Sequence, residues 1–337
     1  MLRDLKETIM LCRVADSLFW MSRYIERAEN NARLLDVNLQ LRRDFDPAAE
    51  ESEQPGAEWA PIISSLEDQE RFHALHAHAT GDSVTDFLTF EPSNPSSIYS
   101  CIARARENAR SVREQISSEM WEQLNQAYLF IGSDDARAMC QSSTYQFFRR
   151  IQEASHLFLG ITDATMTHGE GWDFIQMGKF IERADRTSRI LDVKYHLLLP
   201  SGERVGGNVD TIQWMAVLRS CSGLEAYLKL YVGEVAPWKV AEFLVLNDVF
   251  PRSVCFCAQR LDNALHRITG CPETRYSNEA ERLSGRLRSE LNYTSIGDIF
   301  QRGLHQYLDR TQLRFIEISS ALFDEYCSGE YAQRQAA

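Results

Sequence analysis

The sequence of 337 residues has little proline, no long uncharged apolar run and fewer basic than acidic side chains. Its nine prolines leave room for long helices, because proline interrupts a helix interior. No apolar stretch approaches the roughly 20 residues that cross a bilayer, so we expect no membrane-spanning helix and no membrane partner. With 36 Lys and Arg against 48 Asp and Glu, the formal charge of −12 argues against nucleic acid as a partner.

Several short motifs are also missing from the sequence. There is no GxxxxGK[ST] or GxGxxG segment, so neither a nucleotide cradle nor a bound cofactor is expected. The eight cysteines form no CxxC pair and are interpreted as buried free thiols; the sulfurs of Cys255 and Cys257 would point to different sides of a helix. Residues 1–7 mix acids and bases without an apolar core, so no secretory signal is expected and the sequence favours a cytoplasmic location.

Apolar residues recur every three or four positions along the chain, as at Leu18, Met21 and Ile25, which predicts an all-α fold. Surface loops are expected at 44–58 and 199–208, where acidic residues, proline and glycine gather. Helices are expected at 13–42, 58–78 and 95–118, followed by closing helices. A second series is expected at 171–198, 210–232 and 251–268, again followed by closing helices. Pro95 and Pro251 are expected to open two of them.

Two stretches of the sequence repeat at a spacing of 156 residues. Residues 23–37 and 179–193 share eight identities in fifteen, and residues 86–104 match 242–260 in the same register. A constant register over this length indicates an internal duplication, which predicts a pseudo-twofold helical bundle. We expect an extension at 1–9, one repeat at 10–168, a second at 169–328 and a tail at 329–337, with both repeats in one compact domain.

The repeated helix carries a ladder of charges. Glu26, Glu29, Arg33 and Asp36 fall on one stripe at the border of the apolar face, and the spacing recurs at Glu182, Asp185, Arg189 and Asp192. One interpretation is that these charges pair within and between the two helices. The other is that the helices meet near the pseudo-twofold axis and form a polar pocket.

A second charged stripe lies on the helix expected at 95–118. Arg106, Arg110 and Arg113 share one face, which is either paired within the molecule or able to bind a carboxylate or phosphate. Glu107 and Asn108 would then help to orient a peptide-like ligand. The candidate binding residues are Arg23, Glu26, Arg27, Glu29, Arg33, Asn94, Ser97, Arg106, Glu107, Asn108, Arg110, Arg113, Glu182, Arg183, Asp185 and Arg189.

The chain resembles the alpha-E family of bacterial helical proteins. The resemblance is carried by residues 12–30, Asn94-Pro95-Ser96-Ser97-Ile98, residues 105–110 and residues 178–186, in that order along almost the whole chain. It implies an accessory protein of a peptide ligation or modification system, with a circularly permuted ATP-grasp ligase and a transglutaminase-like peptidase as partners and a peptide as a candidate ligand.

Two alternatives stay open at this point. The protein could be an enzyme of the same pathway that forms or cleaves amides, with Glu26 or Glu182 as acid or base. The less favoured alternative is a di-metal carboxylate bundle, in which the same two glutamates would join Glu70-x-x-His73 and Glu153-x-x-His156. No catalytic residue is assigned, and no metal is expected.

Overall fold

The computed structural model describes residues 2–45, 59, 62–63, 69–197, 208–231, 233 and 235–326. Within these residues it consists of fifteen α-helices and no strand, so the all-α prediction is confirmed. The helices are α1 (Leu2–Phe45), α3 (Gln69–Leu75), α4 (Gly81–Thr89), α5 (Ile98–Ser111), α6 (Ser118–Ile131), α7 (Asp134–Ser142), α8 (Thr144–Thr165), α9 (Glu170–Leu197), α10 (Asn208–Ser220), α11 (Leu224–Leu230), α12 (Pro237–Leu246), α13 (Val254–Thr269), α14 (Glu279–Tyr293), α15 (Ile296–Arg302) and α16 (Leu304–Tyr326).

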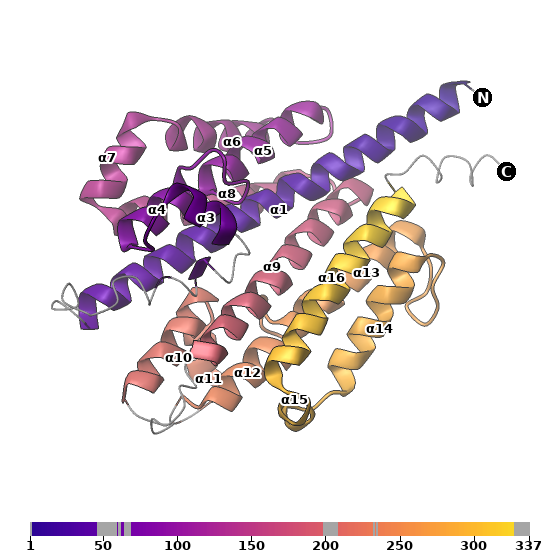
Figure 1. Cartoon of the computed structure of the whole chain (residues 1–337). Helices are drawn as coiled ribbons and strands as arrows, with labels where there is room; N and C mark the ends of the chain where they lie inside the picture. The colour runs from indigo at the N-terminus through magenta and orange to yellow at the C-terminus, as the bar shows by residue number, and fades with distance from the viewer. Residues whose placement is uncertain are drawn as a thin grey trace.

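The long helix α1 runs diagonally through the molecule (Figure 1). Helices α3 to α8 lie on one side of it, and α9 to α16 lie on the other. α1 packs against α5, α8 and α9, while α9 also packs against α13 and α16. The apolar residues spaced along α1, such as Leu18, Met21 and Leu35, are fully buried, as their periodicity predicts.

Helices α1 and α9 approach each other closely at Gly178. A Cβ atom placed on Gly178 would lie 2.3 Å from the carbonyl oxygen of Phe19, so this position on α9 has no room for a side chain. Further along the pair, the small residues Ala28, Ala32 and Ala184 are buried. The close contact brings the two charged ladders to the same region of the core.

Serine caps, rather than prolines, begin the third helix of each set. The hydroxyl of Ser97 accepts a hydrogen bond from the amide of Ser100, and α5 begins at Ile98. Ser253 caps α13 in the same way. The expected starts at Pro95 and Pro251 are therefore wrong by three residues: the serine hydroxyls satisfy free amides of the first turn, and the prolines lie in the turn before.

Other expected boundaries also change. The helix expected at 210–232 is divided into α10 and α11, because Ser222 adopts a φ of 50° between them. Of the helix expected at 58–78, the described part comprises residues 59, 62–63 and α3. The loop expected at 44–58 lies almost entirely outside the described residues, as does that at 199–208 and the tail at 329–337. Among the helices searched, none combines the length and apolar character of a membrane span.

Candidate functional site

The two Glu-Arg pairs meet between α1 and α9 and exchange partners. Arg27 of α1 donates from Nε to Oε1 of Glu182 at 2.6 Å and from Nη2 to Oε2 at 2.8 Å. Arg183 of α9 donates from Nε to Oε1 of Glu26 at 2.8 Å. Each arginine therefore binds the glutamate that precedes the other, and the two helices are joined by two crossed ion pairs.

Glu182 is surrounded by cations. Besides Arg27, it accepts hydrogen bonds from Nε of Arg23 at 3.0 Å and Nε of Arg186 at 3.1 Å. Its side chain has no solvent exposure. Three guanidinium groups thus compensate for the burial of one carboxylate, as burial of a charge requires.

Glu26 and Glu29 share a second set of cations. Arg252, from the turn before α13, donates from Nη1 to Glu26 at 2.7 Å and from Nη2 to Glu29 at 3.1 Å. Glu29 also binds Arg33, which in turn donates from Nε to the carbonyl oxygen of Ser220 at 2.6 Å. All of these side chains are buried. We call Glu26, Glu29, Glu182 and the arginines that bind them the Glu-Arg cluster.

Asp185 and Arg189 lie outside this exchange. Asp185 is bound by Nε of Arg189, one turn along α9, at 2.9 Å, and each side chain is 14% exposed. Asp192, the last residue of the ladder, is 2.8 Å from Nδ1 of His305 on α16. The ladder of α9 therefore diverges from that of α1, whose equivalent Glu29 and Arg33 are buried in the cluster.

The cluster keeps its carboxylates ionised. Burial by itself raises the pKa of Glu26, but the charges of Arg183 and Arg252 outweigh burial and lower this pKa to about 2. Burial likewise opposes ionisation of Glu182, while Arg27 and Arg23 hold its pKa well below the usual range. A carboxylate enclosed by cations and ionised at neutral pH is a weak base and a poor proton donor. This geometry does not favour Glu26 or Glu182 as acid or base.

The arginine stripe is engaged within the molecule. Arg106 donates from Nε to Asn125 at 2.8 Å, and Glu107 lies between Arg106 and Arg110, accepting from each at 2.8 Å. The guanidinium of Arg113 lies 4.6 Å from the ring centroid of Trp121. Arg110 remains 65% exposed, so the outer part of the stripe stays accessible. The backbone carbonyl of Asn108 accepts from the hydroxyl of Ser111 at 2.7 Å.

Asn94 and Ser97 shape the turn before α5. The buried side chain of Asn94 donates to the carbonyl oxygen of Phe87 at 3.1 Å and accepts from the amide of Ser96 at 2.8 Å. Nearby, Asn31 of α1 donates to the carbonyl oxygen of Ser96 at 2.6 Å. These contacts hold the turn against α1 and give Asn94 a structural role.

The residues considered for a di-metal site are not brought together. Glu153 pairs with Arg149 at the surface, and His156 lies 3.7 Å from Glu29 rather than from Glu26 or Glu182. Within the described residues, the histidine, cysteine and acidic side chains close enough to share one metal ion are a different set, His266, Cys271 and Glu281.

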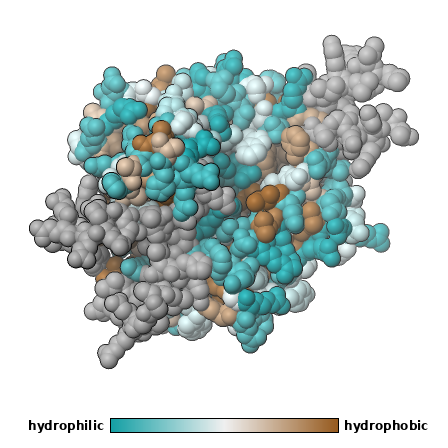
Figure 2. Space-filling view, in the orientation of Figure 1, coloured by the Kyte–Doolittle hydropathy of each residue, from teal (hydrophilic) through white to brown (hydrophobic). Residues whose placement is uncertain are grey.

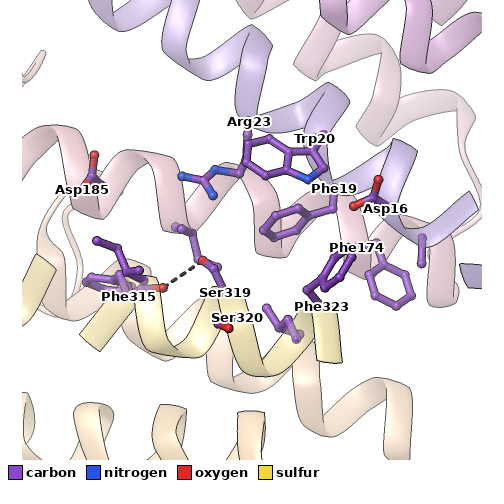
Figure 3. A pocket seen from close by; sticks show the side chains of 14 residues that line it. Asp16, Phe19, Trp20, Arg23, Phe174, Asp185, Phe315, Ser319, Ser320 and Phe323 are labelled. Atoms are coloured by element: carbon purple, nitrogen blue, oxygen red, sulfur yellow. Dashed lines mark hydrogen bonds between the residues drawn. The ribbon is translucent and has the colours of Figure 1, made fainter. Parts of the chain in front are cut away.

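A pocket of about 350 Å³ adjoins the Glu-Arg cluster between α1, α9 and α16. Figure 3 shows aromatic rings along it, with Asp16 beside Phe19 and Phe174, Arg23 beside Trp20, and Asp185 at the opposite end from Asp16. α16 contributes Phe315 and the half-exposed Phe323. In Figure 2 an apolar area lies among hydrophilic residues over this part of the molecule.

Sequence reasoning missed this pocket and two members of the cluster. Arg252 and Arg186 were not singled out, because their equivalents in the first half are Ser96 and Asn30, so the repeat gave no signal for them. The one sequence signal for Arg252 was its place directly after Pro251, in a segment that matches the first half of the chain. The pocket depends on α16, whose position follows from tertiary packing.

The structure thus defines an all-helical protein built around a buried Glu-Arg cluster with an adjoining aromatic pocket. Residues 10–327 match the model of the Alpha-E family, described as a predicted alpha-helical domain with a conserved ER motif. The chain belongs to this family. The Glu-Arg pairs at 26–27 and 182–183 lie within the matched range.

Curated relatives match over most of the chain. The uncharacterized protein Mb2597 of Mycobacterium bovis is 25% identical over 293 residues, and the uncharacterized protein Rv2567 of Mycobacterium tuberculosis is 24% identical over the same length. Each match covers 82% of this chain and 32% of the relative. The chain therefore spans about a third of the length of these relatives. No solved structure matches it.

Proposed function

We propose that the chain is a helical interaction protein of a peptide ligation or modification system. It acts with a circularly permuted ATP-grasp ligase and a transglutaminase-like peptidase, and it holds an apolar peptide end in the pocket between α1, α9 and α16. The observation that carries this proposal is the aromatic pocket, with one carboxylate that no basic side chain of the described residues binds and one anchored arginine. Family membership and the greater length of the mycobacterial relatives, which join the matched part to further sequence, support it.

The walls of the pocket suit an apolar side chain. Phe19, Trp20, Phe174, Phe315 and Phe323 line it (Figure 3). Its volume is within the lower range of small-ligand sites. An aromatic or branched aliphatic side chain would bury its surface there, with a contribution of about 1.5–3 kcal/mol to binding.

The charges at the pocket suit the two ends of a short peptide. Burial raises the pKa of Asp16, and among the described residues no basic side chain pairs with it. Arg23 is held by Glu182 through Nε, and its guanidinium lies 4.8 Å from the ring centroid of Trp20. Asp16 can therefore bind an ammonium group, while the terminal nitrogens of Arg23 can donate to a carboxylate.

The spacing between these charges limits the length of the ligand. Asp16 and Arg23 are seven residues apart on one helix, which corresponds to a rise of about 10 Å. A dipeptide with free ends, or the terminus of a longer peptide, spans this distance. In this account the Glu-Arg cluster has a positioning role, because it fixes Arg23 and the α1–α9 contact beneath the pocket.

We also infer an internal duplication of the helical unit. α3 and α11, α4 and α12, and α5 and α13 begin 155 or 156 residues apart. The crossed pairs of Arg27 with Glu182 and Arg183 with Glu26 link equivalent residues of the two halves. Asn31 and Thr187 also donate to equivalent carbonyl oxygens, those of Ser96 and Arg252. These correspondences support a pseudo-twofold arrangement of two repeats in one domain.

Isothermal titration calorimetry with the dipeptide Leu-Phe, its N-acetyl form and its C-terminal amide tests the proposed pocket. Loss of either charged end is expected to weaken binding by about tenfold, because each removes a charge-assisted hydrogen bond. Asp16→Asn should weaken binding of the free dipeptide but not of the N-acetyl form.

Phe323→Ala should weaken binding of all three peptides, whereas Leu313→Ala is a matched control. Leu313 is 52% exposed on the same helix and lies outside this pocket. The pocket proposal is wrong if none of the peptides binds at millimolar concentration, or if Asp16→Asn and Phe323→Ala leave the affinity unchanged.

A further inference from the structure

Three different metal-binding side chains converge beyond the end of α13, away from the Glu-Arg cluster. His266 is in the last turn of α13, Cys271 follows in the loop, and Glu281 is in the first turn of α14. One donor atom from each lies within 4.8 Å of the other two. Imidazole, thiolate and carboxylate are all ligands of Zn²⁺ in proteins.

A hydrogen bond fixes the orientation of the histidine ring. Its Nδ1 lies 4.0 Å from Oε1 of Glu281 and hydrogen-bonds to the carbonyl oxygen of Cys271 at 2.9 Å. Its Nε2 lies 3.8 Å from Oδ1 of Asp262, one turn earlier on α13. If Nδ1 bound a metal, Nε2 would carry the proton and face this carboxylate.

The buried carboxylate of Asp262, which faces His266, is an independent observation in favour of a metal site. Its side chain is 2% exposed, and Oδ2 accepts from Nη1 of Arg288 at 2.9 Å. Its Oδ1 is buried and has no hydrogen-bond partner in the described part of the chain. A buried carboxylate oxygen left without a donor costs stability, and metal-bound histidines commonly donate their second N–H to such an oxygen.

The glutamate is also fixed in place. Oε2 of Glu281 accepts from the amide and the hydroxyl of Ser277, and Oε1 accepts from the hydroxyl of Thr269. Oε1 keeps one lone pair for a metal. These hydrogen bonds are of the kind that orient a carboxylate ligand.

A hollow in the surface opens beside these donors. Its volume is about 960 Å³, and both His266 and Glu281 line it. Cys271 is partly exposed. Three protein donors next to solvent leave a fourth position for water or another ligand, which distinguishes such a centre from a closed structural zinc site.

We propose that His266 Nδ1, Cys271 Sγ and Glu281 Oε1 form a zinc site with one open position, supported by Asp262. Zinc binding would move the proton of the neutral imidazole from Nδ1 to Nε2 and replace the thiol proton, so that one proton is released and the Cys271 carbonyl loses its present donor. No redox change is involved. The site is independent of the peptide pocket.

Titration of the chelator-treated full-length protein with Co²⁺ tests this site, because a cobalt–thiolate bond gives a charge-transfer absorption in the near ultraviolet. We expect one Co²⁺ per chain with this absorption, and its stoichiometric loss when Zn²⁺ is added. Cys271→Ser should remove the absorption, while Cys12→Ser, which changes another partly exposed cysteine, should retain it.

Asp262→Asn should weaken Zn²⁺ binding by about 10- to 100-fold without removing the charge-transfer band. Circular dichroism of each variant identifies any loss of fold. Cys271→Ser is the variant least expected to unfold, because Cys271 lies at a partly exposed loop position. Absence of Co²⁺ binding to the wild-type chain, or a band that persists in Cys271→Ser, would overturn the proposal.

Discussion

Arg27 of α1 binds Glu182 of α9 through two nitrogen atoms, at 2.6 and 2.8 Å, within the core of the molecule. The contact is bidentate and almost completely shielded from water, since Glu182 has no exposure and Arg27 is 15% exposed. Together with the crossed pair of Arg183 and Glu26, it fixes α9 against α1. The Glu-Arg motif therefore has a structural role, which is to join α1 to α9.

Removal of one charge from the crossed ion pairs between α1 and α9 is expected to destabilise the fold. Glu182→Gln would leave three largely buried arginines, Arg23, Arg27 and Arg186, without their shared carboxylate, which costs about 3–5 kcal/mol of unfolding free energy. Glu107→Gln is the matched control at a half-exposed glutamate that also binds two arginines, with an expected change below about 1 kcal/mol. Urea denaturation measures both. Equal stability of the two variants would contradict a structural role for Glu182.

The same carboxylates predict a loss of stability in acid. The folded-state pKa of Glu26 is lowered to about 2, and the pKa of Glu182 is also well below its ordinary value. Their stabilisation is therefore complete above the unfolded pKa, about 4.3, and is lost as pH falls toward 2. The urea midpoint should fall between pH 5 and pH 2, and Glu26→Gln should flatten this dependence. A wild-type midpoint that stays constant over this range would refute the prediction.

The contact between α1 and α9 at Gly178 predicts a strong effect of one methyl group. Gly178→Ala would place Cβ 2.3 Å from the carbonyl oxygen of Phe19, so the helices must move apart, at an expected cost of about 1–3 kcal/mol or more. Gly160→Ala on α8, where nothing lies within 4 Å of the added Cβ, should instead stabilise by about 0.5–1 kcal/mol.

Thermal unfolding followed by circular dichroism compares these two alanine variants directly. The expected result is a lower midpoint for Gly178→Ala and an unchanged or higher midpoint for Gly160→Ala. If Gly178→Ala unfolds at the wild-type temperature, the two helices do not need their close approach.

Much of the fold could be predicted from the sequence, because apolar periodicity directly determines which face of each helix is buried. The helix that carries Leu18 and Met21 and the repeated ladder at Glu26 and Glu182 were visible in this way. Helix starts were less accessible: both a proline and a nearby serine can mark a first turn, and only the structure shows that Ser97 and Ser253 provide the caps.

The candidate site was accessible only in part. The ladder predicted that charges lie at a buried border, but spacing on one helix cannot name partners from another, so Arg252 was missed. The stripe at Arg106 and Arg113 was visible, whereas its contacts with Trp121 required the packing of α5 against α6. The peptide pocket and the zinc site both depend on side chains from elements far apart or on loop geometry.

The most direct test of the proposed interaction role is affinity capture of the tagged chain from its own cells, with bound proteins and peptides identified by mass spectrometry. Wild type and Asp16→Asn are compared. We predict that both forms retain a circularly permuted ATP-grasp ligase and that only the wild type retains a short peptide with an apolar end. Recovery of the folded chain with no ATP-grasp ligase, in repeated captures under mild conditions, would contradict the account.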